Sequence, residues 1–187
     1  MNPMKIRRFL RELATTGLVL LGILAARSSL ADHYVVPSGS MEPALVSGDR
    51  VFVDKRAYGL RVPFTLLRIS SGERAVRGDV VIVDEPAEGT RLIKRVAAIG
   101  GDLVEIHNGV VSVNCVEQDE SWRNLRSGGG PGMAPTRVPR GQVLLLGDHR
   151  GNSRDGRVFG FVAENELYGR AAGVYWRTGE GFVWRDL

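Results

Sequence analysis

Short runs rich in valine and isoleucine, separated by turn residues, occupy most of the chain after residue 49. Runs of this length that end at Gly, Pro, Asn or Asp are typical of β-strands. No helical segments alternate with them and no segment is repeated, which argues against parallel βαβ units. The sequence therefore predicts a mainly β, antiparallel domain, with strands at residues 50–54, 79–84, 91–99, 102–106, 110–113, 142–146, 168–176 and 181–184 and a short helical turn at 164–167.

One hairpin is specified by its turn. Residues 102–106 and 110–113 flank His107-Asn108-Gly109, and the Asn-Gly pair suits a type I′ turn between antiparallel strands. Two other stretches are expected to lack regular structure: residues 58–77, which mix Pro, Gly and Ser with apolar side chains, and residues 127–135, whose consecutive glycines predict a mobile loop. We interpret residues 115–139 as a short insertion.

The charge of the chain is concentrated at its N-terminus. Residues 1–12 form a basic head that carries +3 of the formal net charge of +4. The rest is close to neutral, which predicts no nucleic-acid-binding face. Cys115 is the single cysteine, so an intramolecular disulfide is excluded. The histidines are far apart and no zinc-ligand spacing occurs, so we expect no metal and no cofactor.

Residues 13–26 are uncharged and largely apolar. As a helix they would cover about 21 Å, and continuation to Ala31 would give about 28 Å, close to the ~30 Å of a hydrocarbon core. However, a basic head, a short apolar run and Ser29-Leu30-Ala31 also describe a cleavable signal peptide. In either case the basic head stays in the cytoplasm and the remainder of the chain lies outside it.

Residues 37–43 form a shaped loop between this apolar run and the first predicted strand. Two serines flank Gly39, and Pro37 and Pro43 bracket the group, which fixes the backbone locally. Such a loop is also a common linker between an anchor and a domain. A serine hydroxyl here could act as a nucleophile only with a base beside it.

Two residues could supply that base. His149 beside Asp148 would allow a Ser-His-Asp arrangement, but the chain has no Gly-x-Ser-x-Gly elbow, and His149 could equally be a polar loop residue. Lys94 shares a strand face with Leu92, Val96 and Ala98, where burial would lower its pKa and free the amine to act as a base. The alternative for Lys94 is an edge-strand lysine that reaches water.

Four motifs, in order, resemble type I signal peptidase, the membrane-bound Ser-Lys endopeptidase that removes signal peptides. The resemblance extends from Pro37 to Arg170. The motifs are Pro37-Ser38-Gly39-Ser40-Met41-x-Pro43; Gly48-Asp49 through Lys55; Arg77-Gly78-Asp79-Val80-Val81 with Leu92-Ile93-Lys94-Arg95-Val96 and Gly101-Asp102; and Gly147-Asp148-x-Arg150-x-Asn152-Ser153-x-Asp155-x-Arg157-x-x-Gly160.

The resemblance implies a role for each matching residue. Ser40 would be the acylated nucleophile and Lys94 its general base. The Ser40 backbone N–H and the Ser38 hydroxyl would form the oxyanion hole. Ser153 would orient Lys94 through a hydrogen bond. Two ion pairs would brace the site: Asp148 with Arg95, and Asp155 with Arg157.

The resemblance also implies how the substrate is bound. A signal peptide with small residues at −1 and −3, usually Ala-x-Ala, would lie extended between two segments of the chain. These segments contain the expected substrate-binding residues Val35, Val36, Pro37, Leu92 and Ile93. The chain departs from the family pattern at His149, Gly151 and Gly156, where we expect altered loop rigidity and retained activity.

Finally, the resemblance implies a topology. Residues 1–12 would be the cytoplasmic head, residues 13–31 an uncleaved, single-pass anchor in the inner membrane, and residues 32–187 a catalytic domain on its outer face. The expected partners are preprotein signal peptides and the lipid bilayer. Two alternatives stay open: a pilin-maturation peptidase of conjugative transfer, and a membrane-tethered β domain that binds peptides without cleaving them.

Overall fold

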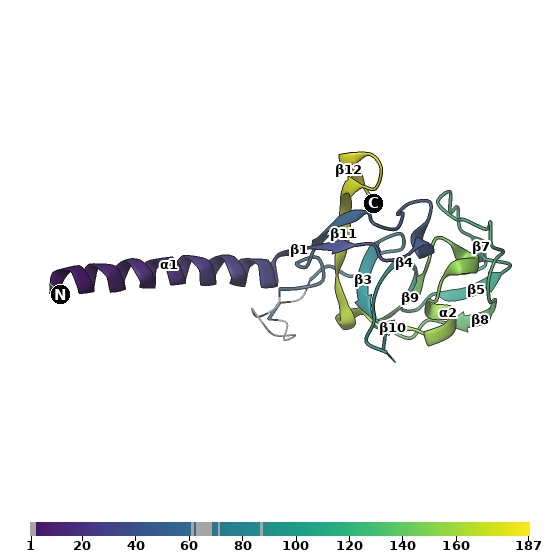
Figure 1. Ribbon diagram of the computed structural model, residues 1–187. Helices are drawn as coiled ribbons and strands as arrows, with labels where there is room; N and C mark the ends of the chain where they lie inside the picture. The colour runs from purple at the N-terminus through teal and green to yellow at the C-terminus, as the bar shows by residue number, and fades with distance from the viewer. Residues whose placement is uncertain (1–2, 61, 63–68, 71, 87) are drawn as a thin grey trace.

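The computed structural model describes residues 3–60, 62, 69–70, 72–86 and 88–187. A long helix, α1 (Pro3–Ser29), extends away from a β-rich domain and carries the N-terminus at its far end (Figure 1). Strand β1 (Ala31–Val35) follows it directly. Within the described residues, no helix combines the length and the hydropathy expected of a membrane-spanning helix, so the predicted transmembrane segment is not confirmed.

A large antiparallel sheet forms most of the β domain. Its strands are β1, β2 (Arg50–Asp54), β11 (Leu167–Arg177), β3 (Val80–Asp84), β4 (Arg91–Ile99), β9 (Gln142–Leu146) and β10 (Val162–Ala163), in that spatial order, with β12 (Gly181–Asp186) paired to β11. Every pair in this sheet is antiparallel. The predicted mainly β, antiparallel class is confirmed.

A smaller antiparallel sheet lies at the end of the domain away from α1 (Figure 1). Its strands are β7 (Val116–Glu117), β6 (Val110–Val113), β5 (Leu103–His107) and β8 (Met133–Arg137), in that order. The turn between β5 and β6 has φ of 50° at Asn108 and 80° at Gly109, as a type I′ turn requires. That hairpin prediction is confirmed.

Short helical turns connect several of the strands. They are η1 (Gly39–Met41), η2 (Arg150–Asn152), α2 (Gly156–Phe159) and η3 (Glu164–Glu166). Turn η3 corresponds to the helical turn predicted at residues 164–167. Turn η1 contains the candidate nucleophile, and η2 and α2 belong to the C-terminal motif.

Two local predictions need correction. Residues 127–135 were expected to form a mobile loop, but β8 begins at Met133 and pairs with β5. Strand β1 was not predicted because residues 31–35 lack an apolar run and follow a long helical segment; pairing with β2 defines this strand. The irregular stretch predicted at residues 58–77 lies partly outside the described residues, and its described residues form no helix or strand. Tyr58 and Ala75 are nevertheless buried in the core.

The third correction concerns the two faces of β4. Simple alternation places Ala98 on the face of Leu92 and Val96, but a register shift between Val96 and Ala98 interrupts the pairing with β9. As a result, Ile99 packs in one cluster with Leu92 and Val96, and Ala98 packs in another. A β-bulge of this kind moves every later side chain to the opposite face.

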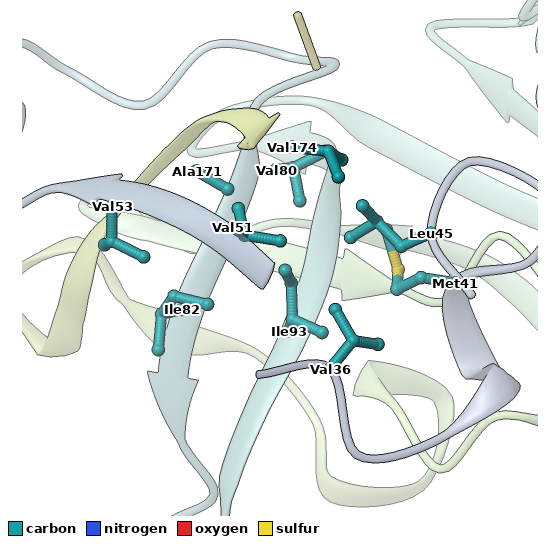
Figure 2. Packing of buried hydrophobic residues seen from close by; sticks show 10 residues of the cluster. All are labelled: Val36, Met41, Leu45, Val51, Val53, Val80, Ile82, Ile93, Ala171 and Val174. Carbon is teal, nitrogen blue, oxygen red and sulfur yellow. The ribbon is translucent and has the colours of Figure 1, made fainter. Parts of the chain in front are cut away.

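One apolar cluster fixes the segment that contains Ser40. Side chains from the loop after β1 pack against the sheet, and Figure 2 shows this cluster: Val36, Met41, Leu45, Val51, Val53, Val80, Ile82, Ile93, Ala171 and Val174. Met41 and Leu45 are completely buried. Since a fully buried side chain of this size contributes about 1.5–3 kcal/mol, these two residues hold η1 firmly on the sheet.

Candidate active site

Ser40 and Lys94 meet in the interior of the domain. Ser40 lies on η1 and Lys94 lies on β4. Their neighbours in the sequence, Met41 and Ile93, belong to the same apolar cluster (Figure 2). The Nζ atom of Lys94 is 2.7 Å from Oγ of Ser40, and the contact is buried. The packing that immobilises η1 therefore also brings the hydroxyl to the amine.

The surroundings of Lys94 change its acidity. Only 2% of its surface is exposed, and desolvation lowers its pKa from 10.5 to about 8. The negative charges of Asp155 and Asp148 oppose this shift. With a pKa of about 8, about one molecule in ten has a neutral Lys94 at pH 7, against about one in 2,500 for an unperturbed lysine. The arrangement can therefore withdraw a proton from Ser40.

Two hydroxyl groups were expected to assist this pair. The Ser38 Oγ lies 3.4 Å from the Ser40 Oγ, close enough to face a group bound at Ser40. Ser153 was expected to hydrogen-bond Lys94, but its buried Oγ has no hydrogen-bond partner among the described residues. The structure therefore places Ser38 beside the nucleophile and does not show the expected bond from Ser153.

Gly147 explains how tightly Ser153 is packed. A Cβ atom built on Gly147 would lie 2.2 Å from the Ser153 Oγ and 2.6 Å from the Ser40 carbonyl oxygen. Both distances are shorter than the contacts that Cβ atoms make in proteins, so a side chain at this position would displace one of the two serines. Gly147 belongs to the fourth motif, but the motif implied no role for it; its position immediately after an apolar strand is the only signal in the sequence.

The two predicted ion pairs are both present. Arg95 donates from Nε and Nη2 to the two Asp148 oxygens at 2.9 and 2.8 Å, and Asp148 is fully buried. Arg157 pairs with Asp155 in the same bidentate way at 2.8 Å, and both side chains are inaccessible to solvent. Asp155 also accepts a hydrogen bond from the Gly147 backbone N–H at 3.0 Å, which connects this pair to the site.

His149 does not form the alternative triad. Its Nε2 lies 2.9 Å from the Ser127 Oγ, and its Nδ1 is 3.9 Å from Glu42. The carboxylate of Asp148 is engaged by Arg95 instead of the imidazole. What His149 contributes to the nucleophile loop is its backbone N–H, which donates to the Ser40 carbonyl at 3.1 Å.

The expected substrate-binding residues line two neighbouring segments. The first half of β4 pairs with β3, and pairing with β9 begins only at Arg95, so residues 91–94 present one edge with no strand among the described residues. The Tyr34 hydroxyl donates to the Arg91 carbonyl at 2.9 Å, which brings the end of β1 close to this edge.

Burial differs among these five residues. Val35 and Pro37 are exposed and Leu92 is half-buried, whereas Val36 and Ile93 are 1% and 2% exposed. Figure 2 shows the Val36 and Ile93 side chains close together in the apolar cluster. The unpaired edge of β4 therefore lies beside buried apolar side chains, here called the apolar floor.

This combination of an antiparallel β domain and a buried serine–lysine contact is that of a serine peptidase. A family model described as signal peptidase, peptidase S26, matches residues 9–176. The chain therefore belongs to the signal peptidase family, peptidase S26, and the family predicted from the four motifs is confirmed, as is its class of enzyme, a serine endopeptidase.

Curated relatives agree with this assignment. The chain is 32% identical to a probable signal peptidase I-2 of Synechocystis sp., over 89% of this chain and 71% of that protein. It is 30% identical to a signal peptidase I of Leptolyngbya laminosa, over 89% of this chain and 80% of that protein. A chloroplastic thylakoidal processing peptidase 1 of Arabidopsis thaliana is 33% identical over 80% of this chain and 43% of its own length.

Proposed function

We propose that this protein removes signal peptides from exported preproteins, using Ser40 as nucleophile and Lys94 as general base. The observation that carries this proposal is the buried 2.7 Å contact between the Lys94 Nζ and the Ser40 Oγ. Family membership supports the same chemistry. No cofactor is required, because proton transfer and acylation use only groups of this chain.

The first half of the reaction forms an acyl-enzyme. The Ser40 Oγ attacks the carbonyl carbon of the −1 residue while neutral Lys94 accepts the hydroxyl proton. The Ser40 backbone N–H and the Ser38 hydroxyl donate to the oxyanion. Collapse of this intermediate breaks the peptide C–N bond, and the Lys94 ammonium returns the proton to the amine of the departing mature chain.

The second half regenerates the enzyme. Water attacks the ester carbonyl while Lys94 accepts one of its protons. The ester bond then breaks, the signal peptide leaves with a carboxylate end, and the Ser40 Oγ recovers its proton from Lys94. The ion pairs of Asp148 with Arg95 and Asp155 with Arg157 hold the loop around Lys94 during both halves. Ser153 is the residue proposed to orient the amine.

The substrate would bind by strand addition. An extended signal peptide can form main-chain hydrogen bonds with residues 35–37 and 91–93, while alternate side chains enter the apolar floor at Val36 and Ile93. Small residues at −1 and −3 would fit there, which favours Ala-x-Ala sites.

Helix α1 would be the membrane anchor, with the catalytic domain on the outer face of the inner membrane. Large apolar side chains remain exposed along this helix: Leu10, Leu13, Leu18, Val19, Leu20, Leu21, Ile23 and Leu24. A bilayer would cover this surface, and the basic head would remain in the cytoplasm. If α1 anchors the protein, we expect the protein to stay in the membrane pellet after alkaline carbonate extraction at pH 11. Release of the protein by carbonate alone would contradict the proposed anchor.

The test of function uses full-length protein in detergent and a preprotein whose signal peptide ends in Ala-x-Ala. We expect a mature product whose mass corresponds to cleavage directly after the second Ala. Turnover only on a pilin precursor would favour a pilin-maturation peptidase. A protein that neither cleaves nor becomes acylated at Ser40 by a penem probe would be a peptide-binding domain.

A further inference from the structure

A segment of the predicted insertion lies directly against the active-site loop. The Asn124 backbone N–H donates to the Asp148 carbonyl at 2.8 Å, and the Asn124 carbonyl accepts from the Arg150 N–H at 3.0 Å. These bonds form an isolated parallel bridge between Asn124 and His149. Residues 120–124, here called the bracing segment, therefore follow the loop that contains Asp148.

The bracing segment also contacts this loop through Glu120. The Glu120 carboxylate accepts from Arg150 Nη2 at 2.6 Å, and Arg150 is 1% exposed. Arg150 in turn donates from Nε to the Gly147 carbonyl at 3.0 Å. The position of Gly147, one residue before Asp148, thus depends on a buried ion pair with the bracing segment.

Trp122 makes the contact that is closest to the chemistry. The Arg95 guanidinium lies over the Trp122 ring, 4.6 Å from its centroid. The edge of the guanidinium is already occupied, by Asp148 on one side and by the Gly78 carbonyl at 2.9 Å on another. The indole ring therefore covers a face of Arg95 and limits its movement out of the plane in which it binds Asp148.

The aromatic ring of Trp122, and not its N–H group, accounts for the contribution of this residue. The Nε1 atom is buried and has no hydrogen-bond partner among the described residues. A buried unpaired donor is unfavourable, so hydrogen bonding does not explain this residue. Its contribution is the aromatic face, which phenylalanine can also provide.

The pair formed by Arg95 and Asp148 acts on Lys94 through its charge. The Asp148 carboxylate favours the protonated form of Lys94, and so does Asp155. Arg95 neutralises the first of these carboxylates, and Arg157 neutralises the second. Burial raises the pKa of Asp148, and the Arg95 guanidinium opposes that rise. Provided that Asp148 stays ionised in the range where Lys94 titrates, displacement of Arg95 leaves its negative charge uncompensated, and the ammonium form of Lys94 becomes more stable.

We propose that Trp122 is a positioning residue for catalysis: its ring holds Arg95 on Asp148 and thereby keeps Lys94 available as a base. Trp122 touches neither Ser40 nor the substrate in this scheme and acts only through Arg95. The role in turnover rests on the proposed Ser-Lys function, whereas the effect on Lys94 can be measured without it.

The experiment measures the protonation of Lys94 directly. The chain has only three lysines, Lys5, Lys55 and Lys94, so ¹³Cε-labelled lysine in the full-length protein in detergent gives an assignable titration. We expect Trp122→Leu to move the Lys94 midpoint upward by at least half a pH unit, and Trp122→Phe to stay within 0.2 units of the unsubstituted protein. The acid limb of kcat/KM should move with the midpoint, which means about a threefold loss below pH 7.

Controls separate positioning from general damage. Trp184→Leu changes an exposed tryptophan on β12 and should leave the Lys94 midpoint where it is. Trp122→Met, which fills most of the same volume without a ring, replaces the leucine variant if that variant does not fold. An unchanged Lys94 midpoint in the ring-less variant, or equal shifts for Trp122→Phe and Trp122→Leu, would overturn the proposal. Absence of turnover in the unsubstituted protein would instead refute the proposed function and leave the titration valid.

Discussion

The Lys94 Nζ and the Ser40 Oγ are 2.7 Å apart although 54 positions separate the two residues in the chain. Two different elements supply them: a single turn of 3₁₀ helix and the interior of a long strand. Because Met41 and Ile93, their immediate neighbours, belong to one apolar cluster, core packing sets the distance between the two reacting atoms. The site is therefore part of the core, and changes to it should affect stability as well as activity.

The serine and the lysine should behave as one catalytic unit. We expect Ser40→Ala and Lys94→Ala each to reduce kcat/KM by several orders of magnitude, and the double variant to be little worse than either, because both residues serve the same proton transfer. Single-turnover cleavage of an Ala-x-Ala preprotein measures this. His149→Ala is the matched control and should retain most activity. Additive losses in the double variant would show that the two residues serve separate steps.

Lys94 should make the folded protein less stable at neutral pH. Its pKa falls from 10.5 to about 8 on folding, so the unfolded chain binds more protons between these values. The resulting loss in the free energy of unfolding is fully present below pH 8, decreases as the pH rises, and vanishes above pH 10.5. We therefore expect Lys94→Met to raise the free energy of unfolding by about 3 kcal/mol at pH 7, by much less at pH 10.

Urea unfolding of the full-length protein in detergent at both pH values measures this difference. Ser40→Ala leaves the buried amine in place and should show no such pH-dependent gain. A Lys94→Met variant whose gain is the same at pH 7 and at pH 10 would mean that Lys94 is not desolvated in the folded protein.

Gly147 should not tolerate a side chain. An added Cβ would overlap the Ser153 Oγ and the Ser40 carbonyl oxygen, and the second atom belongs to the backbone that carries the nucleophile. We expect Gly147→Ala to reduce kcat/KM at least a hundredfold with a much smaller change in KM. Gly22→Ala, where no atom lies within 4 Å of the added Cβ, is the control and should be silent. Near-normal turnover of Gly147→Ala would mean that the loop is looser than the structure shows.

The sequence was most informative where local patterns decide structure. The strands from β2 to β6, β9 and the hairpin turn at Asn108 follow from short-range patterns of apolar and turn residues. Strand β1 could not be predicted in this way, because its residues become a strand only by pairing with β2. The bulge in β4 escaped prediction for a similar reason: it depends on the partner strand β9.

The candidate site shows the same division. The motifs singled out Ser40 and Lys94. The place of Lys94 in an apolar strand left two interpretations, a buried amine or an edge-strand lysine that reaches water, and the structure shows the buried one. The contact of Trp122 with Arg95 could not be found, since it joins an irregular insertion to a distant strand. Nor does the sequence show that the Ser153 hydroxyl lies beside Gly147 and lacks a hydrogen-bond partner in the described part of the chain.

The last prediction concerns the choice of cleavage site. If the substrate lies along residues 35–37 and 91–93, the side chains at −1 and −3 meet the buried Val36 and Ile93, while the −2 side chain points away. A shallow apolar floor accepts a methyl group and excludes branched side chains. Changing −1 from Ala to Val should therefore lower kcat/KM at least a hundredfold, about 2.7 kcal/mol of transition-state binding, whereas large residues at −2 should be tolerated.

Smaller side chains at Val36 or Ile93 should weaken the preference for small residues at −1 and −3. Val36→Ala, or Ile93→Ala, should raise the cleavage of Val at −1 or −3 relative to Ala by at least tenfold, because the removed atoms leave room for the larger side chain. Both residues are core residues, so Ile93→Ala should also cost about 2–5 kcal/mol of stability. Val53→Ala is the volume-matched control for Val36→Ala, because it makes the same truncation in the same cluster on β2, away from the proposed groove. If the Val36 and Ile93 variants lose stability as Val53→Ala does but keep the original preference, the substrate must bind against other strands.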